Sequence, residues 1–279
     1  MDNNDNENYI VDYSEVIVID NSLSDISDNF EIDMCKYSKM SYGDPSEIDC
    51  STNTFIFIDV EDTQCYIWEY CGAIVVSFRG TESFGDAIMD MKMRLEPICE
   101  HIFIDNDKCP KVHRGFKKQF DDVVRQIDEK IKEFVGKSGS LLPIYFTGHS
   151  LGGGLATIAS LYFSFSVSNP IICITFGSPR VGDNLFAKLF DLRIKHSIRF
   201  VNQEDPVPFM PPDLFYEHVG GIRYIDKHDQ IHNKITENRF CNFLRDCMCC
   251  CCGKECPSHD HCCGDYYNAL VKSKHVKLL

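Results

Sequence analysis

A glycine-rich turn between two apolar runs most constrains how this chain can fold. Residues 141–146 read Leu-Leu-Pro-Ile-Tyr-Phe, residues 148–152 read Gly-His-Ser-Leu-Gly, and Gly-Gly-Leu-Ala follows. This order predicts a strand, a sharp turn and a helix, with Ser150 on the turn at the top of a sheet. The glycines allow a close approach of helix and strand backbone. A plain strand-to-helix connection has the same pattern, so the turn alone does not establish a nucleophile.

The remaining apolar patterns predict a mostly parallel sheet flanked by helices. β-branched and aromatic residues indicate a hairpin and then buried strands, over residues 54–70, 73–78, 171–176 and 197–201. Helical spacing predicts a short surface helix over residues 33–42, a helix from Phe116 that Gly136 closes, and a helix over residues 184–193. In such α/β folds, ligands bind beyond the carboxyl ends of the strands, where Ser150 and Asp205 both fall.

Charge and composition divide the chain into two parts. Of its 279 residues, 44% are hydrophobic and 12% aromatic, which indicates a globular protein. The net charge of −14 is uneven, because residues 1–35 contain ten acidic residues and no Lys or Arg. We interpret residues 1–32 as an acidic, mobile extension, with an interaction tail as the alternative, and residues 33–279 as a single domain. Nucleic acid is not an expected partner, because the chain has no basic footprint.

The N-terminal sequence and the apolar runs bear on location. Met-Asp-Asn-Asn-Asp lacks the basic and apolar regions of a secretory signal, and no apolar run reaches the length of about 18 residues that a membrane span needs. We therefore expect an intracellular, cytoplasmic protein, and leave open its association with a membrane surface. Most of the 16 cysteines are expected to be reduced thiols, because the chain is neither small nor visibly secreted.

The order of polar residues after the turn is consistent with a catalytic triad. A serine hydroxyl needs a base to take its proton, and the base needs a carboxylate to orient it. Ser150 is followed by Asp205 and then by His261, and Ser, Asp, His is a known triad order. The backbone N–H groups of Leu151 and Thr81 are the candidate oxyanion donors. Such a site requires neither a metal nor an organic cofactor.

Five motifs in order resemble the class 3, or fungal-type, lipases of the α/β-hydrolase superfamily. They are Phe-Arg-Gly-Thr at 78–81, Val-His-Arg-Gly-Phe at 112–116, Gly-His-Ser-Leu-Gly-Gly at 148–153, Thr-Phe-Gly-Ser-Pro-Arg-Val-Gly at 175–182, and Val-Asn-Gln-Glu-Asp-Pro-Val-Pro at 201–208. The resemblance implies an α/β-hydrolase fold, Ser150 as nucleophile, Asp205 as triad acid, and Thr81 and Leu151 as oxyanion donors.

The resemblance also implies a lid over residues 83–91. Phe84, Ala87, Ile88 and Met91 are spaced at i, i+3, i+4 and i+7, so they form one apolar helical face. Such a face suits a lid that covers an apolar pocket when it is closed. An amphipathic helix that packs permanently on the core has the same pattern.

The catalytic histidine departs from the family pattern. The family places it in Asp-His-x-x-Tyr, whereas here Asp260-His261 precedes Tyr266 with two extra residues between. His259 competes, and the preceding aspartate favours His261. The other nearby histidines are interpreted as structural: His113 and His218 in family-like motifs, and His149 packing or hydrogen-bonding beneath the turn.

A cysteine cluster lies in residues 241–263, where the resemblance is weakest. Its members are Cys241, Cys247, Cys249, Cys250, Cys251, Cys252, Cys256, Cys262 and Cys263. Adjacent cysteines do not readily pair with each other, because a disulfide needs converging Cβ vectors. We place an unmodified loop first and reversible S-acylation second, and a thiolate metal site is the third interpretation.

These observations support a serine ester hydrolase acting on acylglycerols or related lipid esters. The alternatives are a lipase-like lipid-binding or signalling module that has lost turnover, and an acyltransferase or thioesterase that uses the same triad. Head group, acyl length and oligomeric state are not predicted from the sequence.

Overall fold

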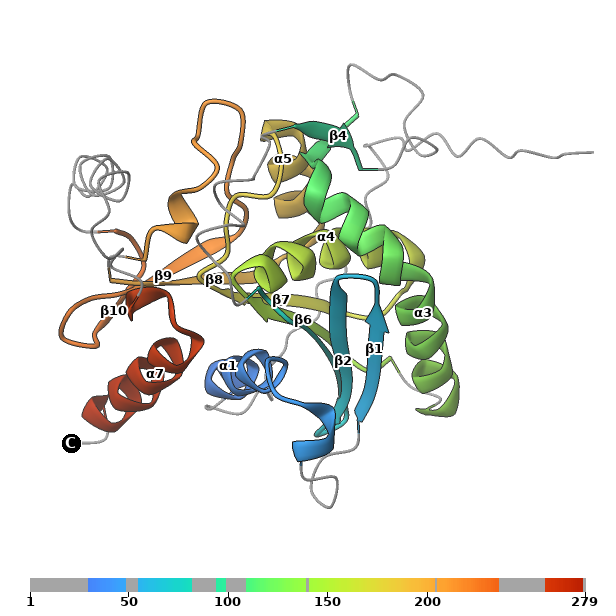
Figure 1. The fold of residues 1–279 in the computed structure, drawn as a ribbon, viewed down its shortest axis with the longest axis horizontal. Helices are drawn as coiled ribbons and strands as arrows, with labels where there is room; N and C mark the ends of the chain where they lie inside the picture. The colour runs from blue at the N-terminus through green and yellow to red at the C-terminus, as the bar shows by residue number, and fades with distance from the viewer. Residues whose placement is uncertain are drawn as a thin grey trace, which may run out of the picture.

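The fold is built on one twisted sheet. The computed structural model describes residues 30–48, 55–81, 94–98, 109–138, 141–203, 205–235 and 259–277. Within these residues, the sheet has the strand order β1-β2-β3-β6-β7-β8-β9-β10 (Figure 1). The strands are β1 (Phe55–Val60), β2 (Thr63–Tyr70), β3 (Ala73–Phe78), β6 (Ile144–His149), β7 (Ile171–Phe176), β8 (His196–Asn202), β9 (Gly221–Ile225) and β10 (Ile231–His232).

The centre of the sheet is parallel and its edges are antiparallel. Strands β3, β6, β7, β8 and β9 pair in parallel, while β1 and β2 form the expected hairpin at one edge and β10 turns back on β9 at the other. The prediction of a mostly parallel sheet flanked by helices is confirmed. Parallel strands require crossover connections; α-helices supply those between β3 and β8, and a segment with one short 3-10 helix connects β8 to β9.

Helices cover both faces of the sheet. They are α1 (Phe30–Met40), α3 (Arg114–Ser138), α4 (Leu151–Ser166), α5 (Asn184–Arg193) and α7 (Cys263–Lys277). Figure 1 shows α3, α4 and α5 on one face and α1 and α7 side by side on the other. The shorter elements are β4 (Leu95–Pro97), β5 (Lys111–His113), η2 (Pro45–Glu47), η3 (Val207–Phe209) and η4 (His259–His261).

Strand β3 packs against the helices on both faces of the sheet. All six of its residues are buried. Ile74, Val76 and Phe78 pack into the cluster that contains α3 and α4, whereas Val75 packs into the cluster that contains α1 and α7. A strand covered on both faces is apolar at nearly every position, as the sequence of β3 is.

Two helices differ from their predictions. Helix α1 begins at Phe30, so the last three residues of the predicted mobile extension are helical, and the helix is not a surface element. It packs on the sheet through Met34 and Tyr37, and the buried Ser38 hydroxyl lies 2.9 Å from the Thr147 hydroxyl. Helix α3 continues through Gly136 to Ser138, because an exposed glycine is tolerated in a last turn.

Several predicted features lie outside the described residues. These are residues 1–29 of the extension, the lid residues Phe84, Ala87, Ile88 and Met91, and cysteines 241–256. In the part of the chain that the structure describes, no helix has the length and apolarity that a membrane crossing requires.

Candidate active site

Ser150 occupies a strained turn between β6 and α4. Its backbone has φ 58° and ψ −127°, a conformation that residues other than glycine rarely adopt. Its N–H donates to the carbonyl of Phe176 at 2.9 Å, which fixes the turn to β7. Gly152 allows α4 to start close to β3, because a Cβ at that position would lie 2.2 Å from the Phe78 carbonyl oxygen. The sequence motif therefore forms the predicted elbow.

Asp205 lies just beyond β8 and is completely buried. Its carboxylate accepts hydrogen bonds from the Val207 N–H at 2.9 Å and the Tyr266 hydroxyl at 2.6 Å. The turn after β7 leaves room for it, because Gly177 has φ +57° and a Cβ there would lie 2.7 Å from Asp205 Oδ2. A buried charge needs such partners to offset its lost hydration.

His261 connects Asp205 to Ser150. Its Nδ1 lies 2.9 Å from each carboxylate oxygen of Asp205, and its Nε2 lies 2.9 Å from Ser150 Oγ. With Nδ1–H donating to the carboxylate, Nε2 carries the lone pair that accepts the hydrogen bond of the serine hydroxyl. Of the two competing histidines, the structure therefore brings His261 to the other two candidate residues, despite the longer spacing to Tyr266.

His149 supports His261 from below the elbow. It is buried, and its Nε2 donates to the backbone carbonyl of His261 at 2.6 Å. Its Nδ1 must then accept the hydrogen bond from the Tyr42 hydroxyl at 2.8 Å. Burial and the neighbouring His261 hold the pKa of His149 well below its ordinary value, so the ring is neutral. This is the role beneath the turn that the sequence predicted.

Sequence reasoning assigned no role to Tyr42 and Tyr266. Burial and the Asp205 charge raise the pKa of Tyr266, so its hydroxyl stays protonated and donates to the carboxylate. The backbone N–H of Asn202 donates to the same hydroxyl at 2.9 Å. The family-like position of Tyr266 after Asp260-His261 was a signal for this residue. Tyr42, two residues after the end of α1, belongs to no recognised motif.

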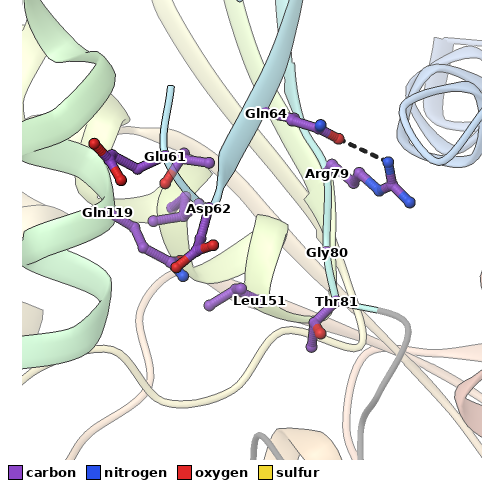
Figure 2. A pocket seen from close by; sticks show the side chains of 10 residues that line it. Glu61, Asp62, Gln64, Arg79, Gly80, Thr81, Gln119 and Leu151 are labelled. Carbon is purple, nitrogen blue, oxygen red and sulfur yellow. Dashed lines mark hydrogen bonds between the residues drawn. The ribbon is translucent and has the colours of Figure 1, made fainter. Parts of the chain in front are cut away.

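Thr81 and Leu151 line the same cavity. Thr81 follows β3, Leu151 is the first residue of α4, and both line one cavity of about 700 Å³ (Figure 2). This places the two candidate oxyanion donors at the same opening. Removing one such donor typically costs a factor of about 10² to 10³ in rate, so their common position matters for the chemistry.

Two other candidate histidines have local partners. His113 is buried, its ring centroid lies 4.6 Å from that of Phe116, and its Nδ1 accepts from the Gly115 N–H at 3.2 Å. His218 donates to the Pro208 carbonyl at 2.5 Å. Lost hydration and the positive charges of nearby arginines lower the pKa of His218. These contacts agree with the structural roles expected for both.

The described cysteines are free thiols, including the exposed Cys262 and the buried Cys263 that follow His261. Within the described ranges, no cluster of three or more His, Cys, Asp or Glu side chains could hold a metal ion. Cys247 and the four consecutive cysteines at 249–252 lie outside those ranges, so whether they are unmodified, S-acylated or metal-bound stays a prediction.

The sheet order, the elbow after β6 and the acid after β8 define an α/β-hydrolase. Residues 75–215 match the model of the family Lipase (class 3). The chain belongs to the class 3 lipase family.

The relatives include lipases and phospholipases. The chain is 32% identical to secreted mono- and diacylglycerol lipase 1 of Fusarium solani over 144 residues, which cover 50% of this chain and 41% of that protein. It is also 32% identical to phospholipase A1-Igamma2, chloroplastic, of Arabidopsis thaliana over 162 residues, which cover 50% of this chain and 30% of that protein. The chain thus spans less than half the length of these relatives.

Solved lipase structures share the fold. The lipase from Rhizopus microsporus var. chinensis has 28% identity and a TM-score of 0.61, with 70% of this chain and 73% of that chain covered. A deletion mutant of the Rhizomucor miehei lipase in its propeptide complex has 26% identity and a TM-score of 0.62, with 71% of this chain and 68% of that chain covered.

Proposed function

We propose that this chain is a serine ester hydrolase that cleaves acylglycerols or related lipid esters. One observation carries the proposal: His261 lies 2.9 Å from Ser150 Oγ and 2.9 Å from both Asp205 oxygens, inside a buried site. The names of the relatives supply the substrate class, because they include mono- and diacylglycerol lipases and phospholipases A1.

The geometry suits a two-step acyl transfer. Ser150 Oγ attacks the ester carbonyl while His261 Nε2 takes its proton, and Asp205 stabilises the resulting imidazolium. The backbone N–H groups of Thr81 and Leu151 receive the oxyanion. His261 then protonates the leaving alcohol. Water then attacks the acyl-enzyme while His261 takes its proton. His261 returns a proton to Ser150 Oγ, and the fatty acid leaves.

The test is a Ser150→Ala variant assayed on p-nitrophenyl butyrate and on mono-, di- and triacylglycerols. We expect kcat to fall by at least about 10⁴-fold, because members of a triad act as a unit. Ser168→Ala, an exposed serine just after α4, is the matched control and should keep the parent rate. Equal rates for Ser150→Ala and the parent protein would disprove the proposal.

Two alternatives use the same residues. The case for a module without turnover rested on the longer spacing between His261 and Tyr266, yet His261 contacts both partners, which supports turnover. Covalent labelling of Ser150 by a fluorophosphonate separates the two, because an activated serine reacts. Acyl transfer or thioester cleavage changes the acceptor or the leaving group. Product analysis with an added alcohol or a thioester distinguishes those reactions from ester hydrolysis.

Contact with a lipid surface and location belong to the same proposal. Leu214 and Phe215 are adjacent, and their exposed fractions are 76% and 64%, which supports contact with lipid. Vesicle sedimentation should detect less binding after Leu214→Ser with Phe215→Ser than after Leu192→Ser on α5.

We retain the intracellular location as a proposal, although two of the relatives carry "secreted" in their names. A fluorescent fusion expressed in the native cell would test it.

A further inference from the structure

The cavity beside Thr81 and Leu151 contains hydrogen-bonding groups that the described residues leave without partners. Thr63 Oγ1 and Gln119 Oε1 are both buried, and neither has a hydrogen-bond partner in the part of the chain that the structure describes. The Thr63 side chain is 1% exposed. Buried polar atoms are nearly always satisfied, and an unsatisfied one costs free energy. A ligand with hydroxyl groups would satisfy both atoms, because Gln119 Oε1 accepts a hydrogen bond and the Thr63 hydroxyl can donate or accept.

The charge at this cavity is negative on one side. Figure 2 shows the side chains of Asp62 and Gln119 converging on the side away from Thr81. The Arg79 guanidinium turns away from Asp62 and donates to Gln64 Oε1 at 2.7 Å. Glu61, Asp62 and Arg79 all line the cavity, but the Arg79 guanidinium is directed away from Asp62, so an anionic group bound beside Asp62 would meet its carboxylate, and like charges at short range repel. The cavity favours an uncharged polar group over a phosphate.

We propose that this cavity is a subsite for an uncharged, hydroxyl-bearing alcohol portion of the ester, such as a glycerol with a free hydroxyl. Gln119 and Thr63 bind the hydroxyls, Leu151 and Leu155 contact the carbon skeleton, and Asp62 disfavours phosphate-bearing head groups. The volume of about 700 Å³ is within the usual range of small-ligand sites. The proposal rests on the proposed ester hydrolysis, because it places the alcohol portion beside the candidate oxyanion donors.

The first experiment removes the hydrogen bonds and keeps the shapes. Gln119→Leu and Thr63→Val are assayed on 1-monooleoylglycerol and on methyl oleate, which has the same acyl chain and no free hydroxyl. We expect the ratio of kcat/KM for the glycerol ester to that for the methyl ester to fall about three- to tenfold in each variant, the usual range for one neutral hydrogen bond. Gln126→Leu, on the same helix α3 and outside the cavity lining, should keep the parent ratio.

The second experiment changes the charge and keeps the size. Asp62→Asn should raise kcat/KM for 1-oleoyl-lysophosphatidate relative to 1-monooleoylglycerol by about threefold or more at low salt, because a like charge is removed. Asp62→Glu keeps the charge and should not raise this ratio. An unchanged ratio in Asp62→Asn would overturn the role of Asp62.

The outcomes separate the two levels of the proposal. If the parent protein hydrolyses both esters and neither Gln119→Leu nor Thr63→Val changes their ratio by more than twofold, the subsite is wrong and the hydrolase stands. If the parent protein hydrolyses neither ester, both the proposed function and the subsite fall. Using a ratio means that a variant with partly impaired folding still gives a result, because misfolding lowers both rates together.

Discussion

The Asp205 carboxylate, on what we call the acid side, and the cavity beside Thr81 and Leu151, on what we call the oxyanion side, differ in how completely their polar groups are hydrogen-bonded. On the acid side, Asp205 is fully buried and receives hydrogen bonds from His261, Val207 and Tyr266. On the oxyanion side, a cavity contains buried oxygens of Thr63 and Gln119 that have no partner among the described residues.

This difference separates two tasks. The acid side holds groups whose positions do not depend on the substrate, so the Asp205 carboxylate has its hydrogen-bond partners before any ligand binds. On our proposal the oxyanion side contacts a variable part of the substrate, which accounts for the two oxygens of Thr63 and Gln119 that lack partners among the described residues. Residues on the acid side should therefore affect rate and stability together, while residues on the oxyanion side should affect substrate choice and leave stability unharmed.

The largest effect should come from Asp205→Asn. We expect kcat to fall by about 10³- to 10⁴-fold, because an amide no longer stabilises the imidazolium or fixes its tautomer. Ester hydrolysis under saturating substrate measures it. Asp213→Asn, an exposed aspartate in the same segment, serves as the control. A loss below tenfold for Asp205→Asn would mean that the carboxylate does not serve as the triad acid.

Tyr266→Phe should lower both stability and activity. It removes a 2.6 Å hydrogen bond to a buried carboxylate, and hydrogen bonds to charged groups contribute about 1.5–3 kcal/mol. Urea unfolding should show a loss of that size, and kcat/KM should fall about tenfold. Tyr267→Phe, the partly exposed neighbour on α7, should change neither. If Tyr266→Phe were as stable as the parent protein, the hydrogen bond from Tyr266 to Asp205 would not contribute to stability.

His149 should make the stability of the folded protein depend on pH. Its pKa in the folded protein lies below the ordinary value of 6.5, so the unfolded chain binds the proton first as the pH falls. The free energy of unfolding should therefore decrease below about pH 6.5, by up to about 1.4 kcal/mol per pH unit from this group. Urea unfolding at pH 5.0 to 7.5 should show a shallower decrease in His149→Gln. An identical pH dependence would show that His149 is not buried in its neutral form.

The smallest effect should be on the stability of Gln119→Leu. The substitution removes a buried oxygen without a partner, so the free energy of unfolding should stay equal or rise by up to about 1 kcal/mol. Urea unfolding of the variant and of Gln126→Leu provides the comparison. A loss above about 1 kcal/mol would mean that Gln119 is part of the structural framework, and the contrast between the two sides would disappear.

Local motifs explain what could be predicted from the sequence. One short strand-turn-helix pattern predicts the positions of Ser150 and Leu151, and the apolar runs of β3 and β7 predict buried strands. The strands β9 and β10 were not predicted, because Gly-Ile-Arg-Tyr-Ile mixes polar and apolar residues and β10 has only two residues.

Other features depend on packing that a linear pattern does not contain. The lysines of helix α1 predict a surface helix, yet its opposite face is buried and the Ser38 hydroxyl is hydrogen-bonded to Thr147. The cavity on the oxyanion side joins the β1–β2 turn to α3, so no short motif indicates it. The hydrogen bond from Tyr42 to His149 spans 107 residues and has the same origin.

The position of His261 sets when the site can form during synthesis. His261 lies 111 residues after Ser150, and it is held where α7, among the last elements of the domain to be made, packs beside α1, among the first. A ribosome-bound chain that has been made up to β8 already contains Ser150 and the candidate oxyanion donors, but it lacks His261, the candidate base. If the proposed hydrolase function holds, such a nascent chain does not yet hydrolyse esters, and activity begins only once the segment from η4 onward has folded against the sheet.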